Sequence, residues 1–571
     1  MRASNASKTS LKNKAAMLQV YCVNNQTTKE FKEGTTLLEM LPEFDFDRPF
    51  PIVSAKVNNV SQGLKFRVYN SRDVEFLDIR QSSAMHVYVR SLCFLLYKAS
   101  TDLFPDSRLY MEHPISNGLY CRIKKHDGQL LDAKEIGLLR DKMQSIVKED
   151  VQFHRHEARI EDAIRMFEDL HQNDKVKLLE TSGQAYTDYY TLGDVTDYYY
   201  GRLLPSTGYL TVWDIEPYED GILLRLPDRN HPDRLAESTP QPKTFEVFAE
   251  SLKWNIIMGL GTVGDVNVAC QGGKARELVQ VAEALQEKKI VEIAEEIDRR
   301  YHSENPVRLV LITGPSSSGK TTFCKRISIQ LLACGLKPVS FSTDDYFVNR
   351  VDTPKLPDGS YDFDNFDTVD HEALERDLLA LLNGEEIEVP EYNFVTGIRE
   401  YNGKRLQLKP GTVLLLEGIH ALNPQLTKKI PETSKFRIFI STLTSTALDD
   451  HNWIPANDTR LLRRIVRDYN KGAFTARQTI SQWPNVCEAE EKWINPYQEN
   501  ADVMFNSAYL LEFAVMRNHA ESILATVPHN SPEYCEAHRL LRFLHYFTPV
   551  PDSEIPSTSM LRQFIGGSSF M

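Results

Sequence analysis

Residues 307–322 constrain this chain more than any other part of its sequence. Residues 307–313 form a short run of apolar and β-branched side chains, which is typical of a buried parallel strand. The residues that follow read Gly-Pro-Ser-Ser-Ser-Gly-Lys-Thr and fit the pattern G-x-x-x-x-G-K-S/T, and residues 323–332 continue with helical spacing. Strand, glycine loop and helix therefore come in the order that a phosphate-binding loop requires.

This order predicts an ATP site. Glycines let the backbone curl so that successive N–H groups point at one anion, and the N-terminus of the following helix adds partial positive charge. We expect Lys320 to reach the β- and γ-phosphates and the hydroxyl of Thr321 to ligate Mg²⁺. The residues expected to bind ATP are Gly314, Pro315, Ser316, Ser317, Ser318, Gly319, Lys320, Thr321 and Thr322.

Two acidic residues follow later predicted strands. Residues 338–342 and 412–416 are apolar enough to be strands, and Asp344 and Glu417 come directly after them. In an open parallel sheet the ligand lies at the carboxyl ends of the strands, so both carboxylates are expected to face the loop. We predict that Asp344 and Glu417 hold Mg²⁺ together with Thr321, and that Asp344 also activates a hydroxyl. The alternative is that the two carboxylates only cap loops.

A predicted helix near residue 460 carries arginines on one face, at positions i, i+3, i+4 and i+7: Arg460, Arg463, Arg464 and Arg467. Such a face repels itself unless an anion neutralises it, and a triphosphate is such an anion. The alternative is that nearby acidic residues, such as Asp458 and Asp468, pair with the arginines.

Six phrases in this half of the chain resemble the uridine kinase and phosphoribulokinase family, and most of all its uridine kinase branch. They occur in the family's order at nearly its spacing: Gly314-Pro-Ser-Ser-Ser-Gly-Lys-Thr-Thr322, Ser342-Thr-Asp-Asp-Tyr-Phe347, Asn365-Phe-Asp367, Val389-Pro-Glu-Tyr-Asn-Phe394, Glu417-Gly-Ile419 and Asp458-Thr-Arg-Leu-Leu-Arg-Arg-Ile-Val-Arg-Asp468. The resemblance implies a P-loop NTPase-type kinase domain with a parallel sheet over residues 305–530, with ATP and Mg²⁺ as cofactors.

The resemblance also implies residue roles. Asp344 would be the general base, and Glu417 would help to hold Mg²⁺. The other catalytic residues that it implies are Lys320, Arg463 and Arg467. The substrate-binding residues that it implies are Asp367, Tyr392, Arg460 and Gln478.

The chain departs from the family in the expected acceptor pocket. Uridine kinases carry a base-contacting histidine a few residues after the tyrosine that matches Tyr392, and Gly397 stands there in this chain. The usual Arg-Gly-Arg of the closing lid reads Lys-Gly-Ala at residues 471–473. The acceptor therefore stays open between a nucleoside and another small alcohol or sugar.

The first part of the chain resembles the N-terminal region of threonyl-tRNA synthetases. The phrases Phe31-Lys-Glu-Gly-Thr-Thr-Leu37, Ala55-Lys-Val-Asn-Asn59 and Phe76-Leu-Asp78 are similar to a ubiquitin-like TGS domain, expected over residues 17–82. Residues 83–228 resemble the second additional domain, which edits mischarged tRNA in that family. Its metal-capable or catalytic positions are replaced here by Arg90, Phe94, Tyr199 and Leu203, so we expect the fold without the editing chemistry.

These segments predict a multidomain α/β and α+β protein. Besides the three domains, we expect a polar tail at residues 1–16, a linker and amphipathic helices at 229–304, and a helical tail at 531–571 that packs against the kinase or a second subunit, which leaves a homo-oligomer open.

Composition limits the partners and the compartment. The net charge of −13 gives no global attraction to nucleic acid, although a local basic patch near residues 12–14 and 122–125 remains open. The eight cysteines contain no C-x-x-C pair, and no apolar run is long enough to span a membrane, so we predict a cytoplasmic protein.

The function predicted from these patterns is an ATP-dependent phosphotransferase, a nucleoside kinase of uridine kinase type acting on a ribose 5′-hydroxyl. One alternative is a kinase for another small alcohol or sugar. Another is an RNA-associated regulatory protein in which ATP acts as a switch and the N-terminal domains bind RNA or a nucleotide effector. A GTPase is a weaker alternative, because no N-K-x-D segment follows the loop.

Overall fold

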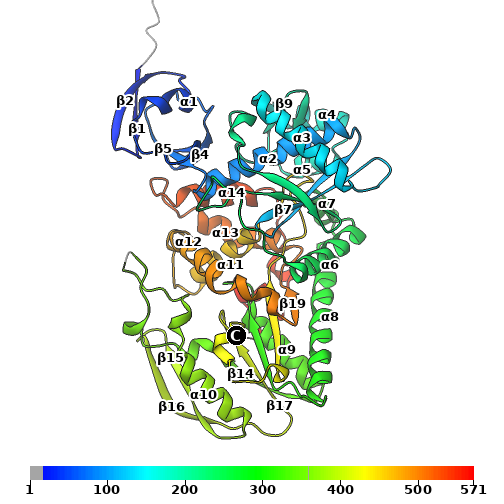
Figure 1. The fold of residues 1–571 in the computed structure, drawn as a ribbon, viewed down its shortest axis with the longest axis vertical. Helices are drawn as coiled ribbons and strands as arrows, with labels where there is room; N and C mark the ends of the chain where they lie inside the picture. Colours follow the sequence, from blue (N-terminus) through cyan, green and yellow to red (C-terminus); the bar gives the residue numbers. More distant parts are fainter. Residues whose placement is uncertain (1–16, 358, 571) are drawn as a thin grey trace, which may run out of the picture.

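The computed structural model describes residues 17–357 and 359–570, so the predicted polar tail at 1–16 lies outside the described residues. Figure 1 shows the N-terminal sheet at one end of the molecule and, toward the other end, the sheet that contains the strand before the phosphate loop. No helix in the described part of the chain is both long and apolar enough to cross a bilayer.

The N-terminal unit is built on one five-stranded sheet with the order β2-β1-β5-β3-β4, in which β1 and β5 run parallel. A short helix follows β2 and begins with a capping box between Thr36 and Glu39. The likeness to a TGS domain stays a prediction. The elements are β1 (Met17–Cys22), β2 (Thr27–Lys32), α1 (Leu37–Met40), β3 (Ile52–Val57), β4 (Val60–Gly63) and β5 (Arg72–Asp78).

The second unit packs a long helix, α2, against two antiparallel sheets with the orders β11-β12-β7-β6 and β10-β9-β8. The four positions singled out for lost editing chemistry are all buried: Arg90, Phe94, Tyr199 and Leu203. The rings of Phe94 and Tyr199 lie 5.4 Å apart, so core packing fills this place. The elements are α2 (Ser82–Leu103), β6 (Arg108–Ile115), β7 (Gly118–Lys124), α3 (Ala133–Glu149), β8 (Phe153–Arg159), α4 (Ile160–Asp169), α5 (Asn173–Thr181), β9 (Tyr186–Leu192), β10 (Val195–Asp197), β11 (Asp214–Tyr218) and β12 (Gly221–Arg225).

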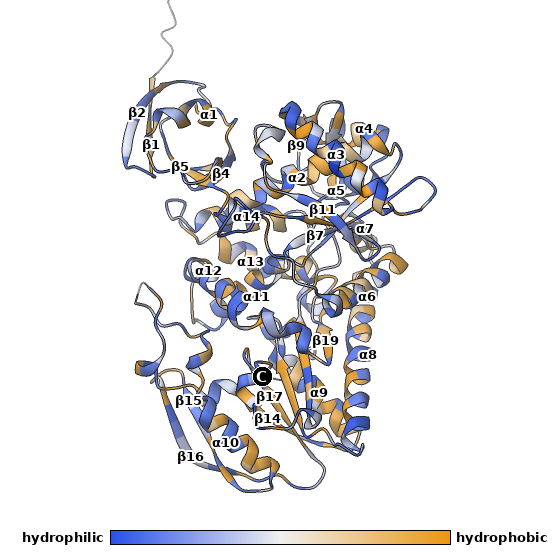
Figure 2. Cartoon of the chain, viewed as in Figure 1, coloured by the Kyte–Doolittle hydropathy of each residue, from blue (hydrophilic) through white to orange (hydrophobic). Residues whose placement is uncertain are grey.

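The kinase half is organised around a five-stranded parallel sheet with the order β14-β17-β13-β18-β19. Its central strand, β13, is apolar from Leu309 to Ile312 and almost fully buried, and Figure 2 shows the hydrophobic colouring of the sheet. This is the pattern of a parallel strand covered on both faces. The strands are β13 (Leu309–Thr313), β14 (Lys337–Ser342), β17 (Thr412–Glu417), β18 (Lys435–Ser441) and β19 (Val503–Asn506), and β15 (Ile387–Asn393) pairs with β16 (Ile398–Leu406) in a separate hairpin.

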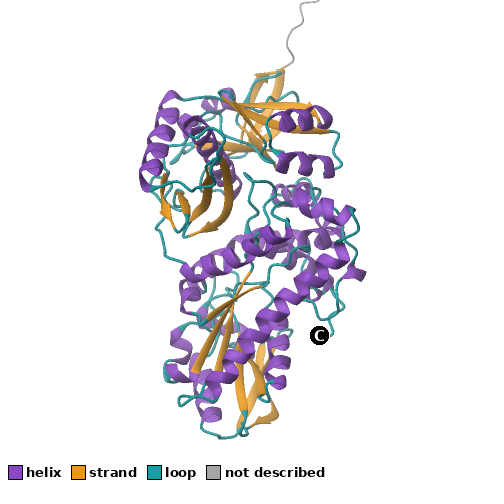
Figure 3. Ribbon diagram, turned by 90° about the vertical axis from the view of Figure 1, so that its right-hand side faces the viewer, coloured by secondary structure: helices purple, strands orange, loops and turns teal. Residues whose placement is uncertain are grey.

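Helices surround this sheet, as the turned view in Figure 3 shows. The amphipathic helix predicted from apolar spacing is present as α8, and the predicted C-terminal tail packs on its own chain through α14 and α15. The helices are α6 (Pro242–Met258), α7 (Val263–Gln271), α8 (Ala275–Tyr301), α9 (Lys320–Ala333), α10 (His371–Leu382), α11 (Ala456–Asn470), α12 (Ala476–Trp493), α13 (Glu512–Leu524), α14 (Tyr534–Leu544) and α15 (Arg562–Ile565).

A buried ionic cluster joins the second unit to the kinase half. Lys175 on α5 is 1% exposed, and its Nζ lies 3.3 Å from Asp174, 3.2 Å from Asp197 and 3.7 Å from Asp449, which follows β18. His451 contacts Asp197 at 2.8 Å. Burial by itself lowers the pKa of Lys175, but the surrounding carboxylates outweigh it, so the pKa lies well above its ordinary value. Removing this cation would leave the carboxylates buried and uncompensated.

We expect Lys175→Ala to lower the free energy of unfolding by about 3–5 kcal/mol, because it breaks a buried ionic cluster from one side. Lys177→Ala is the matched control on the same helix. Its pair with Asp265 is largely solvated, so the loss should stay below about 1 kcal/mol. Chemical unfolding of the two variants measures both values, and equal losses would contradict the structural role of the cluster.

Candidate active site at the phosphate loop

The phosphate loop connects the end of β13 to the start of α9. Gly319 is the N-cap of α9 and has a φ of +93°, a left-handed conformation that glycine adopts without strain. A Cβ at this position would lie 2.8 Å from the terminal methyl of Met560, which would have to shift. The loop thus leads directly into a helix N-terminus, where backbone N–H groups bind anions.

Strand register brings the predicted acidic residues to this loop. Ile312 of β13 and Ser342 of β14 both lie opposite Glu417 of β17, so the three strands end at one edge of the sheet. Asp344 lies two residues beyond β14, in a 3-10 turn, η3 (Thr343–Tyr346), that turns the chain back at this edge. The sheet therefore gathers Asp344 and Glu417 from segments far apart in the sequence.

Lys320 lies within the loop that it is expected to serve. Its ammonium group donates to the carbonyl oxygens of Gly314 at 2.9 Å and Pro315 at 3.1 Å. Burial lowers the pKa of Lys320, whereas the carboxylates of Glu417 and Asp344 raise it. The lysine thus faces both acidic residues across the mouth of the loop.

The two carboxylates repel each other at close range. Burial and the charge of Glu417 raise the pKa of Asp344 to about 6, although Lys320 opposes this shift. The pKa of Glu417 is also raised, chiefly by burial, and its carboxylate accepts a hydrogen bond of 3.3 Å from the hydroxyl of Thr321. Burial disfavours the negative charge of both carboxylates, and a bound cation would stabilise that charge. Carboxylate and hydroxyl oxygens are ligands that Mg²⁺ takes, so these residues fit the ion.

The predicted arginine face is present on α11, but each arginine pairs with an acidic residue. Arg460 pairs with Glu490 at 2.6 Å, and Arg463 is fully buried against Glu512. Arg464 and Arg467 both contact Asp468. Acidic pairing, the alternative to an anion, is thus present for all four arginines, although Asp458 pairs instead with Arg539. The arginines nevertheless reach the loop, since Arg463 donates to the carbonyls of Ser317 and Ser318, and Arg464 to the hydroxyl of Ser316.

Glu490, on α12, was not identified from the sequence. Its carboxylate accepts hydrogen bonds from the backbone N–H of Ser316 at 2.8 Å and from Arg460 at 2.6 Å. A carboxylate therefore occupies an N–H group of the loop that an anion would otherwise use. Glu490 stands in an acidic run, Glu488 to Glu491, with no local pattern that marks it.

Asp367, which is expected to bind the acceptor, and its neighbour Asp364 differ in their exposure to solvent. Asp367 lies in the 3-10 turn η5 (Phe366–Thr368), and its side chain is 77% exposed. Asp364, three residues earlier, lies near Lys320, Arg464 and Glu490; burial and the charge of Glu490 raise its pKa to about 6, against the effect of Arg464. Asp364 therefore interacts electrostatically with residues around the loop, whereas the side chain of Asp367 points to solvent.

The structure also defines the contacts of Tyr392 and Gln478, the other residues expected to bind substrate. Tyr392 is 4% exposed beside Phe347, and its hydroxyl has no hydrogen-bond partner among the described residues. Gln478 instead caps α12, where its side chain accepts from the backbone N–H of Thr475. This capping role, on the exposed start of the helix, is the contact that the structure records for Gln478.

Gly397 lies in the turn between β15 and β16 with a φ of +73°, and a Cβ there would meet Arg350 at 2.7 Å. The guanidinium of Arg350 thus fills the place toward which a side chain at 397 would point. Its buried Nε has no hydrogen-bond partner in the part of the chain that is described. Arg350 is a second residue that the sequence patterns missed.

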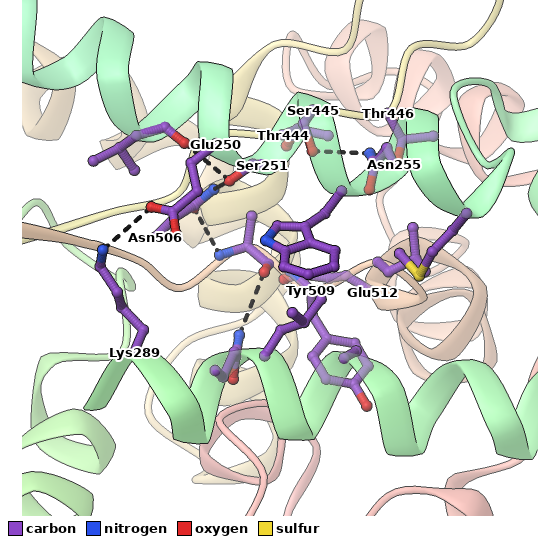
Figure 4. Close-up of a pocket in the computed structure, with 18 of the residues that line it drawn as sticks. Glu250, Ser251, Asn255, Lys289, Thr444, Ser445, Thr446, Asn506, Tyr509 and Glu512 are labelled. Atoms are coloured by element: carbon purple, nitrogen blue, oxygen red, sulfur yellow. Dashed lines mark hydrogen bonds and ion pairs between the residues drawn. The ribbon is translucent and has the colours of Figure 1, made fainter. Parts of the chain in front are cut away.

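A separate cavity of about 180 Å³ lies between α6, α8 and the segment after β19 (Figure 4). Its polar side chains are paired with one another: Lys289 with Glu250 at 3.2 Å, and Asn506 with Ser251 at 3.0 Å. Glu512, which holds Arg463, also lines this cavity. The cavity therefore lies behind the loop, away from Asp344 and Glu417.

Known proteins match the part of the chain that holds this site. Residues 309–510 match the Phosphoribulokinase / Uridine kinase family. The chain is 32% identical over 197 residues to a uridine kinase of Mycoplasma genitalium, covering 34% of this chain and 83% of that protein. It is 28% identical over 235 residues to uridine-cytidine kinase 2-B of Danio rerio, covering 39% of this chain and 82% of that protein. The solved structure of a possible uridine kinase from Bacillus stearothermophilus is similar with a TM-score of 0.27 and 19% identity, over 38% of this chain and 98% of that chain.

Loop, acidic pair and arginine helix all lie within the matched residues, and the match extends over most of each relative's length. Residues 309–510 are therefore a kinase domain with a P-loop fold, and the chain belongs to the Phosphoribulokinase / Uridine kinase family.

Proposed function

We propose that this chain is an ATP-dependent nucleoside kinase of uridine kinase type, which phosphorylates a ribose 5′-hydroxyl with ATP as donor and Mg²⁺ as cofactor. The observation that carries the proposal is the strand register that ends β13, β14 and β17 at one edge of the sheet, where the carboxylate of Glu417 accepts a hydrogen bond of 3.3 Å from Thr321 of the phosphate loop. The names of the uridine kinase relatives support the choice of acceptor.

The loop from Gly314 to Thr322 would bind ATP, the phosphoryl donor. Its N–H groups and Lys320 would hold the phosphates, and Thr321, Glu417 and Asp344 would hold Mg²⁺. When bound, the ion neutralises phosphate charge and orients the transferred group. Glu490 must give up the N–H of Ser316 to the entering triphosphate, and Arg460 is then free to turn from Glu490 to a phosphate oxygen.

Asp344 would accept the proton of the acceptor hydroxyl. A pKa near 6 keeps the carboxylate ionised at neutral pH and makes it a stronger base than an ordinary aspartate. Arg464 and Arg467 would stabilise the charge that develops on the transferred phosphoryl group, since they adjoin Ser316 and Lys320. Arg463 acts indirectly, by holding the loop carbonyls from behind.

Asp364 is the residue that we assign to the sugar hydroxyls, because it is half-buried beside Lys320 and Arg464. Tyr392 would line the acceptor pocket with its unpartnered hydroxyl. The alternative acceptor, another small alcohol or sugar, is favoured by Gly397 and Arg350, which replace the expected histidine by a guanidinium.

The N-terminal units are proposed to bind RNA or a nucleotide effector. A groove of about 440 Å³ between the first two units is lined by basic and aromatic side chains that suit a nucleic acid strand: Lys65, Phe66, Arg67, Tyr69, Arg155 and Arg202. Arg155 and Arg202 of this groove both pair with Asp188, so Lys65 and Arg67 are its basic residues without an acidic partner among the described residues. The basic residues 122–125 are likewise paired, Arg122 with Glu112 and Lys125 with Glu135. Residues 12–14 lie outside the described part of the chain.

We expect Asp344→Asn to lower turnover by roughly 10²- to 10⁴-fold while ATP still binds, because the variant removes the base and keeps the loop. ADP release with a panel of nucleosides and sugars measures turnover, and the same panel identifies the acceptor. Near-normal turnover in the variant would remove Asp344 as the base.

The pH profile of the unaltered protein provides the control. Asp344 works in its ionised form, so kcat/KM for ATP should fall about tenfold per pH unit below about pH 6, where the free protein protonates this carboxylate. The residual activity of Asp344→Asn should lack this inflection.

Asp364→Asn should raise the KM for the acceptor by about tenfold or more, because a charged acceptor of hydroxyl hydrogen bonds is lost. Asp367→Asn is the matched control, and its exposed side chain predicts an unchanged KM. Steady-state kinetics with the acceptor found above decides between them, and the opposite pattern would restore Asp367 as the sugar ligand.

We expect the full chain to shift tRNA in a salt-dependent gel assay, and the double variant Lys65→Glu, Arg67→Glu to reduce the salt slope by about two. Lys134→Glu, an exposed charge on α3, is the control. The absence of any shift at low salt would contradict RNA binding in the groove.

A further inference from the structure

The end of the chain contacts the phosphate loop although it lies outside the family match at residues 309–510. The side-chain oxygen of Gln563 accepts hydrogen bonds from the hydroxyl of Thr322 at 2.8 Å and from its backbone N–H at 3.4 Å. Met560 packs on Gly319, and the ring of Phe564 lies 4.9 Å from the guanidinium of Arg463. Two residues of the segment 559–565, Met560 and Gln563, thus border the loop, and Phe564 packs on the arginine behind it.

Gln563 contacts the end of the loop that leads into α9. Lys320 and Thr321 face Glu417 and Asp344, which marks the end where the phosphoryl group leaves for the acceptor. Thr322 comes next on the first turn of α9 and is 1% exposed. Its N–H is one of the donors at a helix N-terminus that have no partner within the helix, and here it donates to Gln563. A triphosphate that reaches from Asp344 along this loop therefore brings the phosphate nearest the nucleoside to Thr322 and Gln563.

The backbone of the segment is fixed by its apolar side chains. Met560 and Leu561 are fully buried, Phe564 is 1% exposed and Ile565 is 7% exposed, and they belong to two core clusters of the kinase half. Release of the segment would expose all four to water, whereas rotation of one amide side chain exposes none. When a nucleotide binds, the backbone of this segment would therefore stay in place, and only the side chain of Gln563 would rotate.

We propose that Gln563 is a donor-binding residue: its amide turns so that Nε2 donates to the nucleoside-side phosphate of ATP, while segment 559–565 forms the wall of the nucleotide pocket. A half-turn of the terminal amide exchanges its acceptor oxygen for its donor nitrogen. The proposal rests on ATP being the donor, as proposed above. It extends the active site beyond the residues that the family match covers.

The alternative is a purely structural role, in which Gln563 only accepts hydrogen bonds from the hydroxyl and the N–H of Thr322. The two roles need different chemistry. A glutamate at this position keeps the acceptor oxygens for Thr322, so it preserves a cap. It also removes the donor and sets a negative charge beside the phosphate, so it destroys a donor-binding role.

The test compares Gln563→Glu and Gln563→Ala in the full chain with Gln271→Glu, which makes the same charge change on the exposed surface of α7. Calorimetric titration with ATP and Mg²⁺ measures affinity, and thermal unfolding measures stability. We expect Gln563→Glu to weaken ATP binding by roughly tenfold or more with little change in thermal midpoint, and Gln563→Ala to weaken it by about three- to tenfold. Gln271→Glu should bind as the unaltered chain does.

ATP affinity within about twofold of the unaltered chain in both Gln563 variants would overturn the proposal. If Gln563→Glu proves unstable, Gln563→Ala is decided by its two measurements together: weaker ATP binding at an unchanged thermal midpoint supports the proposal, and unchanged ATP binding overturns it. The readout is independent of the acceptor: loss of ATP affinity in a chain that phosphorylates no nucleoside would support this inference and contradict the proposed acceptor. Failure of the unaltered chain to bind ATP would overturn both.

Discussion

The buried guanidinium of Arg463 is the contact on which the rest of the site depends. It lies behind the phosphate loop, donates to the carbonyls of Ser317 and Ser318, and has its charge balanced by Glu512. Because these carbonyls turn back toward Arg463, the opposite side of the loop is left to the N–H groups that an anion needs. Glu512 reaches this place only because α13 follows β19 at the edge of the sheet. The loop geometry is therefore a property of the whole kinase fold.

The local parts of this site could be predicted from the sequence. The loop, the strands before Asp344 and Glu417 and the helix that carries Arg463 all follow from short patterns of apolar and glycine residues. Their partners could not, because Glu490 and Glu512 come from elements tens of residues away and carry no local signal. Spacing also could not predict the exposure of Asp367, because that exposure depends on a 3-10 turn.

The N-terminal units are joined to the kinase half by more than a linker. The cluster around Lys175 crosses the boundary, and one hydrophobic core takes Phe167 from the second unit, Ile465 from α11 and Phe543 from α14. A pocket of about 330 Å³ is lined on one side by the turn after β6 and on the other by Pro315 and Arg460. A ligand in this pocket would therefore lie beside Pro315 of the phosphate loop.

If Asp344 is the base, a triphosphate held by the loop must face this carboxylate across the acceptor hydroxyl. A crystal structure of the full chain with Mg²⁺, a non-hydrolysable ATP analogue and the acceptor measures this geometry. We expect the γ-phosphate beside Lys320 and the acceptor hydroxyl within hydrogen-bonding distance of Asp344. A triphosphate bound elsewhere, or an acceptor hydroxyl out of reach of Asp344, would contradict it.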